Sequence, residues 1–515
     1  MKIALISTLT YPSDQGLRYI SSYLRDKLKH KTIMIFLPIE ENYNLNYSEK
    51  TLAQLRDLVK DCDLIGISAF GSTRFRAQQV LSFLKKEVPK IPLIWGGVHA
   101  TLWPEECIEY ADMVCMGEGE EAIGELVIKL EKHQNYLDTK NFVFKKDGKI
   151  IKNELRNLTH DLDSLPPADY DIENHYIIDS SNSIVKFKEK DFGGQIFNMT
   201  VRGCPNACTY CINYAWRSKY IGKGKLIRRH SVDYVIKDLA RLKNKYRSIG
   251  TIDMRAETLF VMPIEEIREF CDKYKKQINL RFKCLSDPPT MDYEKLKLFV
   301  DAGLTDIIIG IQAGTDRINY EIYKRFISTK QVLKAAEIVN KFKGKVAVMY
   351  DMITCNPYET EQDLVDTIKL MKKLPPPFFL SINNLVFFPG TELEKRARLD
   401  GIIKTDKDTA ADLNYWDRWK HIKLKKKNEY LILIINLMRG VATKHRFGVM
   451  PRFLLNILTT KSLIKLNQKY KLPTYIAGNI VQGFDFLREN LAKKIYRKIL
   501  PPSFKNWYDK IRYRI

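Results

Sequence analysis

The sequence predicts an α/β protein that consists of two arrays of βα units followed by a basic, helical C-terminal region. Short apolar runs alternate with amphipathic helical stretches from residue 1 to about 135, and the same alternation resumes from about 193 to 400. Beyond Gly401 the apolar residues recur with the period of helices. Because 515 residues are too many for one hydrophobic core, we expect about two to four domains.

The first array, residues 1–135, predicts a Rossmann-like parallel sheet. Helical patterns such as 16–28 and 74–86 separate its apolar runs. The five predicted strands are 3–7, 32–37, 64–68, 93–95 and 113–116. Strands that alternate with helices form a sheet covered on both faces, and the ligand site of such a sheet lies beyond the carboxyl ends of its strands.

Three loops at those carboxyl ends, 68–73, 96–101 and 117–120, combine glycines with polar residues. A glycine lets the backbone approach a ligand closely, although it serves equally well in a plain tight turn. We interpret the loops as candidate cofactor contacts. The residues concerned are Ser68, Gly96, Gly97, His99, Thr101, Gly117, Glu118 and Gly119.

Residues 136–192 are predicted to be a linker, with a hairpin around Asp147-Gly148 and a proline-bearing connector at 162–167. The second array, residues 193–400, predicts a partial (βα)6 barrel whose catalytic groups stand on the loops after the strands. Its predicted strands are 197–201, 251–254, 280–283, 306–311, 346–352 and 379–386. Residues 401–515 are expected to form the basic helical domain.

The most informative motif is the CxxxCxxC run of Cys204, Cys208 and Cys211, which follows the first predicted barrel strand. Thiolates are ligands for iron–sulfur clusters and for zinc, so the spacing decides between them. Zinc is disfavoured, because no second cysteine pair follows and the next histidine is His230. Three thiolates on one short loop fit three irons of a [4Fe–4S] cluster and leave the fourth iron open.

Composition and charge restrict the class of protein. Nine cysteines in a long chain, and a start that runs directly into an apolar strand, argue against a secreted disulfide framework and favour the reducing cytoplasm. The formal charge of +24 is concentrated after Gly401, where about 25 Lys and Arg face about 8 Asp and Glu. Such a surface attracts phosphate on nucleic acid or anionic lipid. No apolar run there is long enough to span a bilayer, so any membrane contact is expected to be peripheral, at the inner face.

The run from Thr200 to Cys211 resembles the signature of radical S-adenosylmethionine (radical SAM) enzymes. The resemblance implies that SAM chelates the open iron and that reductive cleavage of SAM gives a 5′-deoxyadenosyl radical, which abstracts hydrogen from an unactivated carbon. It also implies an external one-electron reductant of the flavodoxin or ferredoxin type. Tyr210 occupies the aromatic position that lies against the adenine.

Further segments resemble the cobalamin-binding branch of these enzymes, which includes the anaerobic Mg-protoporphyrin cyclase. They are 95–101, 104–106, 117–120, 306–325, 350–351 and 388–391. The resemblance implies cobalamin in the first domain and makes Gln312, at the end of a strand, a polar contact to SAM. The chain has no DxHxxG motif, so cobalamin is expected to lack a histidine on its lower face. It also has 355–360 where the family has a glycine-rich stretch, and Cys355 there is interpreted as a packing residue in preference to a functional thiol.

The function expected from the resemblance is cobalamin-dependent methylation or C–C bond formation at an unactivated carbon of a small molecule or a membrane lipid such as an isoprenoid. The lipid option depends on a basic amphipathic stretch, 484–499, with Trp507 nearby, which has the profile of an interfacial anchor or of a basic face packed on the barrel. The alternatives are a radical SAM cyclase or oxidoreductase and a tRNA methylthiotransferase-like enzyme. The last is disfavoured because the C-terminal region is expected to be helical, and Cys62, Cys107 and Cys115 are interpreted as packing residues and not as ligands of a second cluster.

Overall fold

The computed structural model describes residues 1–9, 11–38, 46–405, 409 and 428–470. The chain divides into two compact units. The first consists of Met1–Arg255 with Phe387–Tyr415, and the second of Ala256–Val386 with Trp416–Ile515.

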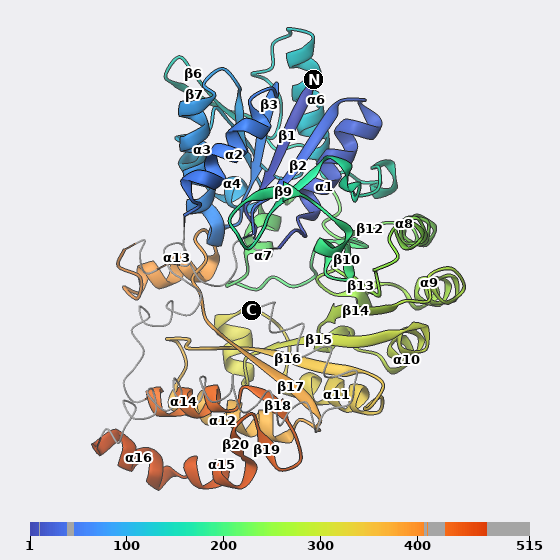
Figure 1. Cartoon of the computed structure of the whole chain (residues 1–515). Coiled ribbons are helices and arrows are strands. Elements are labelled where there is room, and N and C mark those ends of the chain that lie inside the picture. Colours follow the sequence, from blue (N-terminus) through green and yellow to red (C-terminus); the bar gives the residue numbers. More distant parts are fainter. Residues whose placement is uncertain (10, 39–45, 406–408, 410–427, 471–515) are drawn as a thin grey trace. The chain divides into compact units, whose positions relative to one another are not determined.

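The predicted parallel sheet forms the centre of the first unit (Figure 1). Its strand order is β7-β6-β5-β4-β3-β1-β2-β8-β9. The five strands predicted in the first array are all present and parallel: β1 (Lys2–Ser7), β2 (Lys31–Phe36), β3 (Leu64–Ser68), β4 (Leu93–Gly96) and β5 (Met113–Cys115). Their side chains are almost entirely buried, as parallel strands covered on both faces require.

The stretch interpreted as a linker supplies four more strands to this sheet. β6 (Phe142–Lys146) and β7 (Lys149–Lys152) form the predicted hairpin, and β6 pairs antiparallel with β5. β8 (His175–Ile178) lies parallel to β2 and is followed by antiparallel β9 (Ile184–Lys186). These last two strands were not predicted, because they lie outside the regular alternation of strands and helices and their apolar and polar residues do not alternate clearly. The predicted domain boundaries remain predictions.

Six helices accompany the sheet. Asp14 caps the first of them by accepting a hydrogen bond from the Leu17 amide at 3.1 Å. The helices are α1 (Gln15–Ser22), α2 (Glu49–Val59), α3 (Arg74–Glu87), α4 (Val98–Leu102), α5 (Pro104–Cys107) and α6 (Glu120–Glu131). One turn of π-helix, Tyr23–Lys27, extends α1 over the predicted length.

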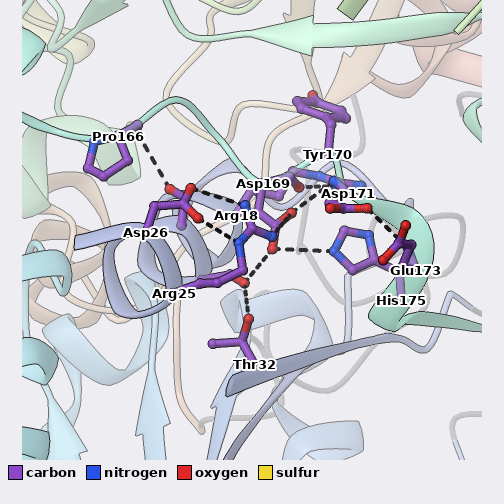
Figure 2. Close-up of polar contacts among 12 residues, drawn as sticks. Arg18, Arg25, Asp26, Thr32, Pro166, Asp169, Tyr170, Asp171, Glu173 and His175 are labelled. Carbon is purple, nitrogen blue, oxygen red and sulfur yellow. Dashed lines mark hydrogen bonds and ion pairs between the residues drawn. The ribbon is translucent and has the colours of Figure 1, made fainter. Parts of the chain in front are cut away.

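A buried carboxylate holds the segment before β8 against α1 (Figure 2). Asp169 accepts hydrogen bonds from the Ser21 hydroxyl at 2.6 Å and the Asp171 amide at 2.8 Å, and Arg25 lies 2.8 Å from it. Arg18 donates to the Asp169 carbonyl at 2.6 Å. Burial alone would raise the pKa of Asp169, but His175 and Arg25 hold it well below its ordinary value. The connection to the second array therefore begins from a fixed position.

The first unit also contains the start of the second array. β10 (Gln195–Asn198) pairs in parallel with β13 (Thr251–Met254), with α8 (Val232–Lys245) between them in the chain. The predicted strand 197–201 is broken after Asn198, and its end becomes part of a separate two-stranded ladder. β11 (Val201–Arg202) pairs there antiparallel with β12 (Arg228–Arg229). The cluster loop and α7 (Ile212–Ser218) follow β11.

The second unit has a mixed sheet. Its four parallel strands are β14 (Arg281–Ser286), β15 (Leu304–Gln312), β16 (Ala347–Thr354) and β17 (Phe378–Asn384), in agreement with the predicted ones. The helices that accompany them are α9 (Ile264–Gln277), α10 (Tyr293–Ala302), α11 (Thr329–Asn340) and α12 (Glu361–Lys373).

The described part of the C-terminal region is not purely helical, in contrast to the prediction. It contains α14 (Glu429–Leu437), α15 (Arg452–Leu458) and α16 (Lys461–Tyr470). Three short antiparallel strands lie between the first two of these helices and extend the sheet from β17: β18 (Gly440–Ala442), β19 (Arg446–Phe447) and β20 (Met450–Pro451). The amphipathic stretch 484–499 and Trp507 lie outside the described residues. None of the helices within the described ranges has the length and apolar character needed to cross a bilayer.

Candidate functional site

The three cysteines of the CxxxCxxC run lie on the loop between β11 and α7. Cys208 is buried, while Cys204 and Cys211 are partly exposed. The Cys211 amide donates to the Cys208 carbonyl at 3.0 Å, and the Cys211 carbonyl accepts from the Tyr214 and Ala215 amides at 3.2 Å each. The third cysteine therefore stands at the start of α7, which fixes its direction.

The start of the loop is fixed by a glycine and an arginine. Gly203 has φ +102°, and a Cβ at this position would collide with the Leu226 carbonyl oxygen. Only glycine suits both the conformation and the close approach. Arg217, on α7, donates a hydrogen bond to the Cys204 carbonyl. Both ends of the loop are thus held by α7 and the ladder of β11 and β12.

The spacing of the three cysteines remains the reason to expect an iron–sulfur cluster. Within the described residues, no set of three or more His, Cys, Asp or Glu side chains is arranged to hold one ion. In a four-iron cluster each thiolate binds a different iron, so the three sulfurs need to surround a larger group. The loop has three thiols, one of them buried, and the assignment of Cys204, Cys208 and Cys211 as cluster ligands remains a prediction.

The segment 388–391 leads into a helix that is bonded to the cluster loop, although the two are about 180 residues apart in the sequence. The Leu393 amide, in α13 (Glu392–Leu399), donates to the Thr209 carbonyl at 2.9 Å. Gly390 has φ +74°, and a Cβ there would lie 2.9 Å from the Trp103 ring, which follows α4. The sequence identified this segment by resemblance alone and indicated none of these contacts.

The loop 96–101 lies at the carboxyl end of β4, as predicted. Gly97 has φ +94°, and a Cβ there would lie 2.9 Å from the Ala69 carbonyl oxygen and 3.1 Å from the Ser68 hydroxyl. Gly97 therefore stands in a crowded backbone corner beside Ser68 that excludes larger residues, whereas a Cβ on Gly96 would make only ordinary contacts, the nearest at 3.8 Å. Thr101 donates to the Gly97 carbonyl at 2.9 Å and accepts from the Gly117 amide at 2.8 Å, which joins two of the three candidate loops.

His99 is almost completely buried among aromatic rings. Its ring lies 5.6 Å from that of Trp95 and 5.3 Å from that of Trp103. Its Nε2 is 3.4 Å from a carboxylate oxygen of Glu106, a long contact with little hydrogen-bond strength. A histidine held in this way can orient a neighbouring group, and its role as a cofactor contact remains a prediction.

The loop 117–120 is occupied by ion pairs that the sequence did not indicate. Arg228 contacts the Glu118 carboxylate at 2.6 and 2.9 Å, and Arg202 contacts Glu118 at 3.4 Å and Glu120 at 2.7 Å. Burial alone would raise the pKa of Glu118, but the two arginines hold it below its ordinary value. The Glu118 amide donates to the Tyr220 hydroxyl at 3.1 Å. Glu118 therefore has protein partners, and its predicted contact to a cofactor is untested.

These contacts make the cluster loop a neighbour of the candidate loops within the first unit. Helix α4, which carries His99 and Thr101, packs against α7, whose N-cap is Cys211. Arg202 stands two residues before Cys204. Arg228, which pairs with Glu118, has a side chain that is only 3% exposed.

The second unit places Gln312 at the carboxyl end of β15. Gln312 has φ +66°, and the ladder with β16 is irregular between Gly310 and Gln312. The side-chain nitrogen of Gln312 folds back over Gly310, and one guanidinium nitrogen of Arg325 lies beside the same glycine. Tyr210 lies on the cluster loop, between Cys208 and Cys211, in the first unit.

Arg325 is a functional candidate that the sequence did not indicate individually. It is 4% exposed, and its Nη1 has no hydrogen-bond partner among the described residues. A buried guanidinium nitrogen without a partner is costly, and a carboxylate is the group that a guanidinium binds best. The only signal in the sequence was its place within the segment 306–325.

Cys355 lies just beyond β16 in the left-handed region, with φ +59°. The family has glycines in this stretch, and glycine adopts that conformation freely. The Cys355 thiol is buried, donates to the Asn384 side-chain oxygen at 3.2 Å, and has a pKa raised by burial to about 12. Nearby Glu359 is also buried, its Oε2 lacks a hydrogen-bond partner among the described residues, and burial raises its pKa to about 8.

The N-terminal cysteines have the properties of packing residues. Cys62 and Cys107 belong to the apolar core of the first unit, and Cys115 is buried in β5. Burial raises the pKa of Cys62 to about 11 and that of Cys115 to about 12. Thiols held protonated in this way are poor metal ligands.

Comparison with known proteins agrees with this geometry. The model of the B12 binding domain matches residues 1–127, and that of the Radical SAM superfamily matches residues 198–371. An uncharacterised methyltransferase of Pyrococcus horikoshii is 26% identical over 76% of this chain and 79% of its own length. The anaerobic magnesium-protoporphyrin IX monomethyl ester cyclase of Cereibacter sphaeroides is 25% identical over 62% of this chain, and the chain spans about half of that relative, 51% of its length.

A solved structure shares the fold. The radical SAM methyltransferase TsrM of Kitasatospora setae, with cobalamin and a [4Fe–4S] cluster bound, aligns with a TM-score of 0.60 at 12% identity, over 78% of this chain and 79% of its own. The two matched domains, in the same order as the two predicted arrays, establish the family. The chain is a radical SAM enzyme with an N-terminal B12-binding domain, and the two matched families give it S-adenosylmethionine and cobalamin as cofactors.

Proposed function

We propose that this enzyme transfers a methyl group to an unactivated carbon in a cobalamin-dependent radical reaction. The observation that carries the proposal is the direct connection, within one compact unit, between the cluster loop and the loops of the B12-binding domain through Arg202, Tyr220 and Glu118. Methyl transfer that uses both cofactors requires them to act on one substrate. The relative from Pyrococcus horikoshii, which covers most of the chain, is named a methyltransferase.

Each group of residues has a proposed role. Cys204, Cys208 and Cys211 hold the cluster, and its open iron would bind SAM, beside Tyr210. Gln312 and Arg325 offer a side-chain amide and the guanidinium nitrogen Nη1, which has no partner among the described residues, for the polar end of SAM. Ser68, Gly96, Gly97, His99 and Thr101, with Gly117 and Gly119, would contact cobalamin. When bound, the three cofactors supply the methyl group and the radical, and the protein orients them and excludes water.

Two buried acids near the end of β16 keep their protons at neutral pH. The raised pKa values of Glu359, about 8, and Cys355, about 12, mean that both groups are neutral at pH 7. This end of the parallel strands therefore carries no charge from either group.

The test is anaerobic reconstitution of the protein with iron and sulfide, followed by SAM and a reductant. Release of 5′-deoxyadenosine and transfer of a labelled methyl group from SAM to a product are the expected results. Cys208→Ala should abolish both, whereas Cys271→Ala, a buried thiol on α9, should retain them. Full SAM cleavage by Cys208→Ala would contradict the cluster assignment.

Cyclisation or oxidation is the second candidate, because the cyclase of Cereibacter sphaeroides is also a relative. The labelled methyl group separates the two outcomes. If the protein retains cobalamin but its product carries no labelled methyl group, the reaction is cyclisation or oxidation and not methyl transfer. The tRNA alternative is tested in the same assay by supplying unmodified tRNA.

We also propose that the substrate is membrane-associated and that the C-terminal region contacts lipid peripherally. Residues 430–484 contain eight Lys and Arg and no Asp or Glu. On α15, Phe453 and Ile457 lie one turn apart and are 66% and 51% exposed. Exposed apolar groups within a basic stretch that contains no acidic residues favour an anionic lipid surface over RNA.

Flotation with phosphatidylglycerol vesicles tests this contact. It should be lost in the double variant Phe453→Asp/Ile457→Asp and kept in Leu399→Asp, whose site is exposed in the first unit. Equal flotation of both variants would contradict this contact.

A further inference from the structure

The ion pairs around Glu118 join two segments that serve different cofactors. On one side, the loop 117–120 is bound to the loop 96–101, because the Gly117 amide donates to Thr101 at 2.8 Å. On the other side it is bound to Arg202, two residues before the first cluster cysteine. Nothing in the local sequence of either segment requires this connection.

The connection is buried and balanced in charge. The side chains of Arg202, Arg228, Glu118 and Glu120 are 10%, 3%, 13% and 5% exposed. Two positive and two negative charges face each other, and Arg228 also donates to the Thr159 carbonyl at 2.7 Å. Separating one member would leave a buried charge without its partner, which is strongly unfavourable. The loop 117–120 and the ladder of β11 and β12 therefore move as one body.

Tyr220 makes a second, uncharged link to the same loop. It follows α7, the helix whose N-cap is Cys211, and is 1% exposed. Its hydroxyl accepts the Glu118 amide at 3.1 Å, and the absence of a side chain at Gly117 leaves room for it. The loop is consequently tied to the cluster loop before the first cysteine, through Arg202, and after the third, through Tyr220.

We propose that Glu118 and Tyr220 are positioning residues that couple the cobalamin site to the cluster loop, so that loading of either cofactor favours binding of the other. A change in the loop 96–101 on cobalamin binding reaches 117–120 through Thr101 and Gly117, and from there reaches both ends of the cluster loop. Coupling of two binding equilibria is reciprocal, so the effect is the same in both directions. The proposal rests on the proposed function only for the place of cobalamin at 96–101.

The test is a titration of hydroxocobalamin, followed by absorbance, into full-length protein with and without the reconstituted cluster. In the wild type, the cluster should lower the Kd for cobalamin by about fivefold or more, the lower end of usual coupling strengths. Tyr220→Phe removes one hydroxyl and retains the ring, and it should bring the ratio of the two Kd values close to one. The matched control is Tyr246→Phe, which loses a buried hydroxyl bound to the Tyr170 carbonyl and should keep the wild-type ratio.

Charge variants and the cluster spectrum provide an independent readout. In Glu118→Gln the cobalamin Kd values with and without the cluster should become equal. Glu118→Asp should recover part of the difference, because the negative charge returns on a shorter side chain. The electron paramagnetic resonance spectrum of the reduced cluster should respond to cobalamin in the wild type and in Tyr246→Phe only. A wild-type ratio of one, or an unchanged ratio in Tyr220→Phe, would overturn the proposal even if Glu118→Gln fails to fold. If cobalamin still binds but its Kd does not depend on the cluster, only the coupling is refuted, and the proposed methyl transfer is unaffected.

Discussion

The backbone amide of Leu393 donates a hydrogen bond to the carbonyl oxygen of Thr209, in the cluster loop, at 2.9 Å. The donor comes from the last part of the second array and the acceptor from its beginning. Next to this bond, Gly390 packs on the Trp103 ring, which ends the helix that carries His99. Chain segments from three parts of the sequence thus surround the cluster loop, so its shape depends on contacts that are distant in sequence.

Gly390→Ala should therefore weaken the cluster site. The new Cβ would lie 2.9 Å from the Trp103 ring at a backbone φ of +74°, so the turn must shift and loosen the bond to Thr209. We expect less iron per protein after reconstitution and a lower melting temperature. The control is Gly148→Ala, whose φ of +75° is the same but whose Cβ meets nothing within 4 Å. Equal iron content in the two variants would show that only backbone strain, about 1 kcal/mol, is involved.

Gly203→Ala is predicted to have a larger effect on the same site. The added methyl group would collide with the Leu226 carbonyl, a backbone atom that cannot move aside without opening the ladder of β11 and β12. The cluster loop should then fail to hold a stable cluster, as seen by the loss of its visible absorbance after reconstitution. Gly222→Ala, at φ +80° in open space, should retain the absorbance. A normal cluster in Gly203→Ala would refute the structural role of this glycine.

The sequence predicted the elements well where the pattern is local. The strands β1 to β5 and the hairpin at Asp147-Gly148 were all expected, because strand periodicity and turn chemistry act over a few residues. β4 and β5 are as short as β8 and β9, but they stand in the regular alternation of strands and helices, whereas β8 and β9 were missed because they lie outside it and are defined by the neighbour they pair with. Short strands of this kind carry no periodic signal of their own.

The sequence motifs of the candidate site could be predicted, but the residues that contact its side chains could not. The spacing of Cys204, Cys208 and Cys211 is a local signal that indicates cluster chemistry directly. Glu118, in contrast, stands in a glycine-rich loop, and such a loop looks the same whether its acid contacts a cofactor or an arginine 110 residues away. Arg325 was hidden for the opposite reason, because burial without a partner is visible only in three dimensions.

Arg325→Met should weaken SAM binding. A charge-assisted hydrogen bond to a carboxylate is worth about 1.5–3 kcal/mol, so the Kd for SAM on the cluster-loaded protein should rise by roughly tenfold or more. Anaerobic calorimetric titration measures this without turnover. Arg268→Met removes an exposed arginine of α9 from the same unit and should leave the Kd unchanged. If both variants bind SAM like the wild type, Arg325 serves only the interior of the second unit.

Glu359→Gln should change the pH dependence of stability in a defined direction. Burial, with a contribution from Asp363, raises the pKa of Glu359 to about 8 from an ordinary value near 4.5, so the folded state keeps a proton that the unfolded state loses. The stability contributed by this group is fully present below pH 4.5 and is lost as the pH rises toward 8, by about 1.4 kcal/mol per pH unit. Glutamine resembles the protonated acid and does not titrate. The variant should therefore match the wild type at pH 4.5 and unfold at a higher urea concentration at pH 8. Glu337→Gln, at an exposed site on α11, should follow the wild type at both pH values. Identical midpoints for Glu359→Gln and the wild type at pH 8 would show that folding does not raise the pKa of Glu359.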